Sequence, residues 1–254
     1  MDHDLIVPSF LSPSLTVQAE GAAAFEVKFL VDEAQALEVE AWAARYLEPD
    51  PHGDPAQGGS YQITSLYTDT NAFDVYHRTP KYRRRKYRLR RYGSEPTIHL
   101  ERKVRRGERV TKRRASVSEC DLLLLTHALA IPGWPGYWFH DSLLRKSLFP
   151  ACQLIYQRTA FFGTCSDGPL RLTLDRQIQG QLVSDWKVEV SQQVIPLLPG
   201  EVVLELKFRN AMPVAFKQLV AELQLNSTGI SKYRRCLDAW RHLVALKESG
   251  VKYA

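Results

Sequence analysis

Residues 81–92 read Lys-Tyr-Arg-Arg-Arg-Lys-Tyr-Arg-Leu-Arg-Arg-Tyr, and Gly93 ends the stretch. Successive side chains of a β-strand point to opposite faces. A strand over this stretch therefore gathers one row of cations on a single face: Arg84, Lys86, Arg88 and Arg90. Two more strand patterns follow after short turns, at 97–104 and 109–115, so the sequence predicts a three-stranded meander.

The positive charge of the 254-residue chain is concentrated in and around this meander. Residues 78–114 hold 17 of the 34 Lys and Arg but only three acids, whereas the net charge of the whole chain is only +6. Such a local excess indicates an anionic partner, which could be a nucleotide, polyphosphate, nucleic acid or a membrane surface.

Strands far from the meander repeat its design, with charged side chains on one face and apolar side chains on the other. The charged rows are Glu26 and Lys28; Glu101 and Lys103; Arg171, Thr173 and Asp175; and Glu205, Lys207 and Arg209. An ordinary sheet with one solvated face would also show this pattern. Rows of like charge repel, however, unless an anion offsets them. If the sheet closes on itself, the charged face becomes a lumen suited to a polyanion.

The rest of the chain predicts an α+β fold: a large antiparallel sheet of eight or more strands, open or closed on itself, with peripheral helices. Helices are expected over 33–46, with Asp32 as N-cap, over 118–128 and 137–149, and over 213–223 and 231–247. Further strands are expected over 25–31, 61–68, 153–162, 170–178, 182–190 and 202–209, with glycines between several of them. The hydrophobic fraction of 44% is enough for a sizeable core.

We expect residues 1–22 to be an irregular leader and residues 23–254 to form a single domain. The acidic N-terminus lacks a signal-peptide pattern. No apolar run approaches the roughly 18–20 residues that span a bilayer. The four cysteines have no CxxC spacing. These features favour a cytoplasmic protein, with any membrane attachment supplied by a partner.

Several catalytic motifs are missing from the sequence: GxxxxGK[ST], GxGxxG, HExxH and GxSxG. Nucleophilic catalysis therefore has no support, but phosphoryl transfer needs no protein nucleophile. Glu205 beside Lys207 is either a structural ion pair or a ligand of a divalent cation, since Mg²⁺ and Mn²⁺ prefer carboxylate and phosphate oxygens. Glu26 and Glu101 are weaker candidates of the same kind.

The charged strands resemble those of the VTC domain, the polyphosphate polymerase domain of the CYTH-like triphosphate tunnel superfamily, in a stand-alone prokaryotic form. The resemblance covers roughly residues 24–245 and rests on seven segments in order: 25–29, 87–93, 100–103, 156–161, 171–175, 204–207 and 231–233. Two positions depart from the family pattern. Ala24 replaces a potential metal carboxylate, and Gly229 stands where a basic residue is common.

The resemblance implies an antiparallel β tunnel or barrel of about eight strands with peripheral helices. It also implies a triphosphate or polyphosphate held in that tunnel, with Mn²⁺ or Mg²⁺ bound at Glu205. The implied catalytic phosphate ligands are Lys28, Arg88, Arg90, Lys103, Arg158, Arg171 and Lys207. The implied substrate-binding residues are Lys112, Arg114, Tyr156, Ser231 and Lys232, the last two from a C-terminal capping helix.

Four functions remain open at this stage. The first is polyphosphate synthesis from ATP, with ATP and polyphosphate as ligands. The second is hydrolysis of a nucleoside or inorganic triphosphate, with Glu26, Glu101 or Asp175 orienting water. The third is a module that binds polyphosphate without catalysis. The fourth, nucleic-acid binding through residues 81–114, is not expected, because this stretch alternates as strands, unlike a flexible basic arm. The oligomeric state is not predicted.

Overall fold

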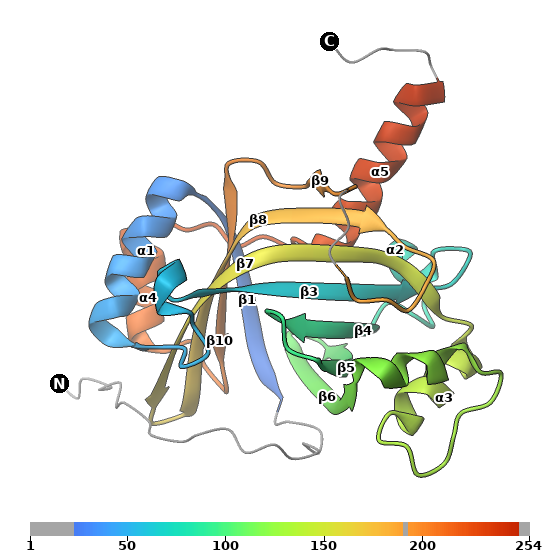
Figure 1. Ribbon diagram of the computed structural model, residues 1–254. Coiled ribbons are helices and arrows are strands. Elements are labelled where there is room, and N and C mark those ends of the chain that lie inside the picture. Colours follow the sequence, from blue (N-terminus) through green and yellow to red (C-terminus); the bar gives the residue numbers. More distant parts are fainter. Residues whose placement is uncertain (1–22, 190–192, 249–254) are drawn as a thin grey trace.

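The structure is a computed structural model that describes residues 23–189 and 193–248 (Figure 1). The leader predicted for residues 1–22 lies outside the described residues. The strands are β1 Ala24–Asp32, β2 Glu48–Pro49, β3 Ser60–Asp69, β4 Arg85–Tyr92, β5 Thr97–Arg106, β6 Arg109–Ser118, β7 Phe149–Cys165, β8 Gly168–Leu182, β9 Ile195–Pro196 and β10 Glu201–Phe208. The helices are α1 Glu33–Tyr46, α2 Asp74–His77, α3 Tyr137–Lys146, α4 Val214–Glu222 and α5 Lys232–Glu248, with 3₁₀ turns η1 Pro55–Gln57 and η2 Glu119–Thr126.

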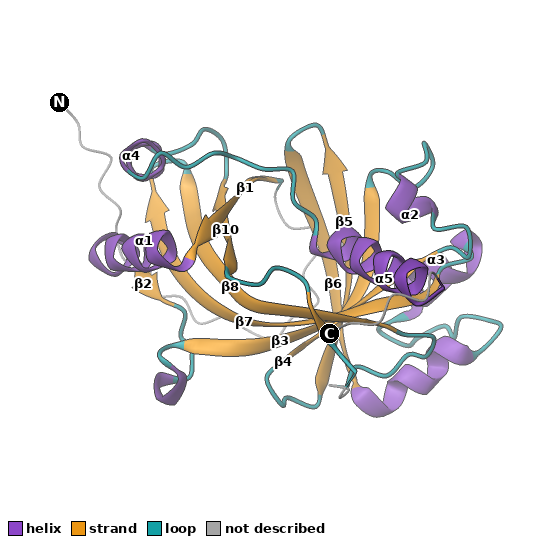
Figure 2. Ribbon diagram, turned by 90° about the horizontal axis from the view of Figure 1, so that it is seen from above, coloured by secondary structure: helices purple, strands orange, loops and turns teal. Residues whose placement is uncertain are grey.

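Eight of the strands form a closed antiparallel ring. Hydrogen bonding runs in the order β7-β3-β4-β5-β6-β1-β10-β8, and β8 pairs back to β7. Figure 2 shows the ring from above, with α1 and α4 at one side and α5 at the other. The predicted antiparallel barrel with peripheral helices is confirmed. No helix in the described part of the chain is long and apolar enough to cross a membrane.

The ring has one short joint, between β1 and β6. This pairing joins only Ala24 to Val110 and Phe25 to Arg109, whereas β1 pairs with β10 over its whole length from Phe25 to Asp32. Past the joint, the segment before α5 lies along the free edge of β1. The amide of Thr228 donates to the carbonyl of Lys28 over 2.7 Å.

The apolar outer face of β1, β8 and β10 packs beneath α1 and α4. Its fully buried side chains include Phe29, Leu172 and Leu204. Helix α1 begins where predicted, because the Asp32 carboxylate accepts a hydrogen bond from the Gln35 amide over 2.8 Å. Burial of leucines on this face leaves the alternate, charged side chains of the same strands on the inner face.

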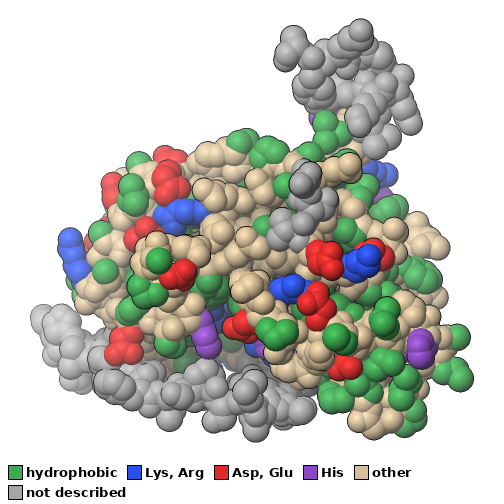
Figure 3. Space-filling view, in the orientation of Figure 1, with side chains coloured by type: hydrophobic (Ala, Val, Ile, Leu, Met, Phe, Trp, Pro, Cys, Tyr) green, Lys and Arg blue, Asp and Glu red, His purple; other side chains and the backbone are tan. Residues whose placement is uncertain are grey.

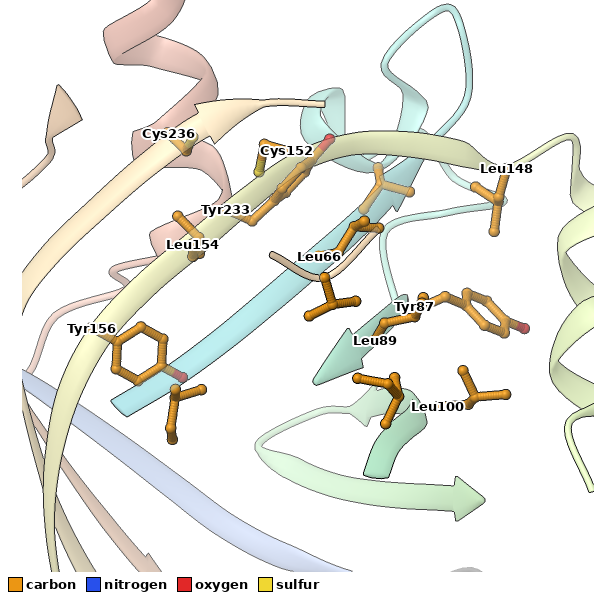
Figure 4. Packing of buried hydrophobic residues seen from close by; sticks show 14 of the residues in the cluster. Leu66, Tyr87, Leu89, Leu100, Leu148, Cys152, Leu154, Tyr156, Tyr233 and Cys236 are labelled. Atoms are coloured by element: carbon orange, nitrogen blue, oxygen red, sulfur yellow. The ribbon is translucent and has the colours of Figure 1, made fainter. Parts of the chain in front are cut away.

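A second apolar cluster lies over the meander and near α5 (Figure 4). Leu66, Leu89 and Leu100 stand on neighbouring strands in register and are fully buried. At the other end of the cluster, Tyr233 and Cys236 anchor the first turns of α5 against β7. The cluster therefore fixes where the C-terminal helix begins relative to the ring.

Three predicted elements differ from the structure. A strand over 182–190 is wrong in its described residues: β8 runs unbroken from Gly168 to Leu182, and 183–189 contain no strand. The break expected between strands 170–178 and 182–190 contains Gly180, which instead lies within β8, where a Cβ atom would come within 2.6 Å of the Cys236 sulfur. Its small size serves packing against α5. The basic strand begins at Arg85, with residues 81–84 in a turn, and the expected helix after Ser118 is 3₁₀.

Candidate functional site

The inner face of the ring, called the lumen below, collects the charged rows of the strands. Side-chain contacts across the ring show this directly, since Lys103 of β5 reaches Glu26 of β1 and Arg90 of β4 reaches Tyr156 of β7. The outside is different: on the face shown in Figure 3, acidic and basic side chains are interspersed. The lumen cations are Lys28, Lys86, Arg88, Arg90, Lys103, Lys112, Arg114, Arg158, Arg171, Lys207 and Lys232.

Glu101 of β5 is the centre of the first charge cluster. It is 1% exposed and binds Arg88 of β4 through Nε at 2.8 Å, and Arg114 of β6 through Nε at 2.8 Å. Lys112 lies 3.4 Å away. Burial alone would raise the pKa of Glu101, but these cations hold it well below its usual range. Glu101 is therefore an anion at neutral pH, with cations on several sides.

Two tyrosines extend this cluster. Arg88 donates to the hydroxyl of Tyr67 over 3.0 Å, and Arg114 donates to the hydroxyl of Tyr92 over 2.8 Å. Burial opposes ionisation of both phenols, yet the surrounding cations, with Arg88 foremost for Tyr67 and Arg90 for Tyr92, lower each pKa to about 7. The field in this part of the lumen is therefore strongly positive.

Glu26 and Glu205 form the second cluster, on neighbouring strands β1 and β10. Glu26 lies 2.6 Å from Lys103 through both oxygens and 3.1 Å from Lys28. Glu205 lies 3.5 Å from Lys28 and 3.0 Å from Lys207. Burial and Glu205 act to raise the pKa of Glu26, but the three lysines outweigh them and lower it to about 2.

Lys103 is the most perturbed lysine of this cluster. Burial lowers its pKa to about 7, with help from Lys28 and Lys207 and against the attraction of Glu26 and Glu205. An ammonium in this position is costly, because it leaves water and faces other cations. A phosphate group would remove that cost.

The third cluster joins the ring to α5. Asp175 of β8 is fully buried and binds Arg158 of β7 through two bonds of 2.6 and 2.7 Å. Lys232, the first residue of α5, binds the same carboxylate over 2.6 Å. Nearby, the Ser231 hydroxyl accepts a hydrogen bond from Lys86 over 2.9 Å. Lys232, and Ser231 just before the helix, therefore contact lumen side chains at the start of α5.

Arg171 lies toward the side of the ring that carries β2. It contacts Asp50 at 3.3 Å and the hydroxyl of Tyr61 at 3.2 Å, and it stacks on Phe162 with 4.6 Å between the guanidinium and the ring centre. Its Nε is buried and has no hydrogen-bond partner.

The structure brings all thirteen predicted site residues onto the inner face of the ring or, for Ser231 and Lys232, beside it. Their roles stay predictions. Sequence reasoning left out Lys86, Tyr67 and Thr173 as site residues. Lys86 and Thr173 stand in the same alternating rows as predicted ligands, so the period-two pattern could have selected them. Thr173 lies opposite Glu205 in the pairing of β8 with β10. Its hydroxyl is buried and has no hydrogen-bond partner.

Glu26 and Glu205 are the carboxylates that best fit a divalent ion. The described residues contain no group of three or more His, Cys, Asp or Glu that could hold a metal. Mg²⁺ usually binds through one or two carboxylates together with waters and substrate phosphate oxygens. The pair fits that smaller requirement, and Glu205 is the predicted ligand. Glu101 and Asp175 fit less well, since arginines already occupy their oxygens.

Comparisons with known proteins agree with this geometry. A family model described as the VTC domain matches residues 23–241. No curated protein matches the sequence. A putative adenylate cyclase from Bacillus halodurans has a similar solved structure, with 13% identity, a TM-score of 0.50, and coverage of 83% of this chain and 94% of that chain.

Two further solved structures resemble the chain less closely. One is a putative adenylyl cyclase from Hippeastrum described as having a dominant triphosphatase activity, with 13% identity, a TM-score of 0.45 and coverage of 92% and 98%. The other is the protein PH1819 from Pyrococcus horikoshii, with 12% identity, a TM-score of 0.46 and coverage of 85% and 99%. At these identities the likeness concerns the fold alone.

Proposed function

Because this chain belongs to the VTC domain family, we propose that it transfers the γ-phosphate of ATP to the end of a growing polyphosphate chain. The reaction takes place in the lumen and uses Mn²⁺ or Mg²⁺. The physiological partners are ATP and polyphosphate. A membrane protein that receives the product remains an expectation from the sequence.

The observation that carries the proposal is the balance of charge inside the ring. Lumen cations outnumber the carboxylates Glu26, Glu101, Asp175 and Glu205, and several of these cations are arginines. Arginine forks match phosphate oxygens and bind them bidentately. A linear anion with regularly spaced charges, such as a triphosphate or a longer polymer, suits a lumen to which seven of the eight ring strands contribute cations.

In this proposal the lumen residues have different roles according to their position. Lys28, Arg88, Arg90, Lys103 and Arg171 hold the γ-phosphate, and the terminal phosphate of the polymer attacks it in line. The new P–O bond lengthens the chain by one phosphate, while the bond to the β-phosphate breaks and ADP leaves. Catalysis of phosphoryl transfer rests on positioning and on charge stabilisation, which these groups supply. Glu205 would hold a divalent ion, which would supply further neutralisation of phosphate charge.

Hydrolysis by the same lumen is the runner-up, and the carboxylates argue against it. A triphosphatase needs a carboxylate that is free to orient water. Each of the four lumen carboxylates contacts at least two cations: Glu26 contacts Lys28, Lys103 and Lys207; Glu101 contacts Arg88, Lys112 and Arg114; Asp175 contacts Arg158 and Lys232; and Glu205 contacts Lys28 and Lys207. These contacts favour transfer to a phosphate over transfer to water.

The test is product analysis. Purified protein is incubated with ATP and Mn²⁺, and the products are resolved on a polyphosphate gel beside Lys103→Ala and Glu205→Ala. Lys217→Ala, on the exposed face of α4, serves as the matched lysine control. A ladder of chains made by the unaltered protein and the control, and lost in both lumen variants, supports the proposal. Free phosphate without a ladder moves the function to triphosphatase, and absence of turnover with tight polyphosphate binding leaves a binding module.

A further inference from the structure

A row of cations leaves the lumen at the end where α5 begins. Lys86 is its inner member, since its ammonium binds Ser231 and lies 5.8 Å from the ring centre of Tyr233. Arg234 stands in the first turn of α5. Arg78 ends α2 and has a positive φ of 56°. Neither arginine was selected by the sequence analysis or used in the proposed reaction.

The helices α2 and α5 are fastened together, which fixes the two arginines near each other. The Tyr76 hydroxyl of α2 donates a hydrogen bond to Asp238 of α5. The Tyr233 hydroxyl of α5 donates to Asp69, the last residue of β3. Asp69 also accepts hydrogen bonds from the amides of Val75 and Tyr76 at the start of α2. The row is therefore built on packed elements, although Arg78 itself is exposed.

The cations of this row repel one another and lack carboxylate partners. Burial, with the charges of Lys28 inside the lumen and of Arg78 and Arg234 outside it, lowers the pKa of Lys86 to about 8 against the opposing effect of Tyr67. No ion pair joins Lys86, Arg78 or Arg234 to a carboxylate in the part of the chain that the structure describes. The nearby acids are engaged elsewhere: Asp69 and Asp238 with tyrosines, and Asp74 with the hydroxyls of Thr70 and Thr79.

We propose that Lys86, Arg78 and Arg234 form a distal phosphate-binding track, which holds the part of a linear polyphosphate that extends out of the lumen past the start of α5. An anion there relieves the mutual repulsion of the three cations. The identity of the ligand rests on the proposed function. The track itself adds a separate property: long chains bind more tightly than a triphosphate, which ends inside the ring.

The experiment compares two ligands on three proteins. Affinities for tripolyphosphate and for long-chain polyphosphate are measured by calorimetry on the unaltered protein, on Arg78→Ala/Arg234→Ala, and on the control Arg45→Ala/Lys217→Ala. The control removes the same charge from exposed positions on α1 and α4, at the opposite side of the ring (Figure 2).

We expect the double variant to bind the long chain about tenfold more weakly, because it loses two partly screened charge contacts. It should bind tripolyphosphate within about twofold of the unaltered protein, because the shorter ligand does not reach the two arginines. The salt dependence of long-chain binding should become shallower in this variant alone. Equal losses for both ligands, or no loss for either, would overturn the track. So would displacement of long polyphosphate by single-stranded RNA at equal phosphate concentration. Failure of the unaltered protein to bind either phosphate would instead remove the proposed function, and the track with it.

Discussion

Asp175→Asn, which replaces one carboxylate oxygen by an amide nitrogen at nearly constant size, should destabilise the empty protein strongly. Asp175 is fully buried, and its oxygens lie 2.6–2.7 Å from Arg158 and Lys232. The amide leaves both cations without a negative partner in a buried position. Removing one member of a buried ion pair costs about 3–5 kcal/mol. For a chain of this size, that corresponds to a fall in Tm of about 6–20 °C.

The assay is urea unfolding at neutral pH, with and without tripolyphosphate. Tripolyphosphate should stabilise the variant by more than it stabilises the unaltered protein, because it supplies the charge that Arg158 and Lys232 have lost. Arg105→Ala is the control: its pair with Glu108 is exposed, so the change in unfolding free energy should stay within about 1 kcal/mol.

The difference between Asp175→Asn and the unaltered protein should also depend on pH. Arg158 and Lys232 depress the pKa of the folded Asp175 against the effect of burial. Its contribution is therefore complete above its unfolded pKa of about 3.9 and is lost as the pH falls through the folded value. A loss of less than about 1 kcal/mol at neutral pH, or equal stabilisation of both proteins by tripolyphosphate, would refute this account of the third cluster.

Three further predictions address single residues. Binding of tripolyphosphate at pH 8 should take up protons, because a phosphate raises the lowered pKa of Lys103. Calorimetry in buffers of different ionisation enthalpy measures the number of protons taken up. Lys103→Arg should reduce that number, because arginine is always charged. Thr173→Val should raise the urea midpoint of the empty protein, since it removes a buried hydroxyl that has no partner, at a gain of about 1–3 kcal/mol, whereas Thr173→Ser should not. Leu204→Ala should cost about 2–5 kcal/mol in the same assay, because Leu204 is fully buried beneath α1 and α4; a change under about 1 kcal/mol would contradict the packing described for that face.

Local patterns were enough to predict most of the fold. Alternation predicted which side chains of each strand point inward, and the Asp32 cap located the start of α1. Closure of the ring was expected only from the resemblance and from the cost of stacked like charges. The unbroken course of β8 was not predicted, because a glycine in the sequence does not show whether it ends a strand or, like Gly180, makes room for a neighbour such as Cys236.

The sequence alone did not predict which charged side chains pair with each other in the structure. Asp50 pairs with Arg171, and Asp175 pairs with Lys232 from α5, across 121 and 57 residues of chain. Such pairings depend on which strands become neighbours. Lys86 was visible in the basic row but lies just before the segment 87–93 that resembles the VTC domain, so the resemblance did not select it. The metal and the reaction stay predictions.

In the empty ring, the cations of the lumen already contact carboxylates that are fixed to the same chain. The lumen therefore resembles an ion exchanger that carries its own counter-ions. A phosphate that takes Lys28, Lys103 and Lys207 must displace Glu26 and Glu205, and it leaves two buried carboxylates with their charge exposed to each other. In the proposed function, a divalent ion at Glu205 would restore neutrality at that point. Affinity for phosphate and affinity for metal are then two sides of one equilibrium, and each must raise the other by the same factor.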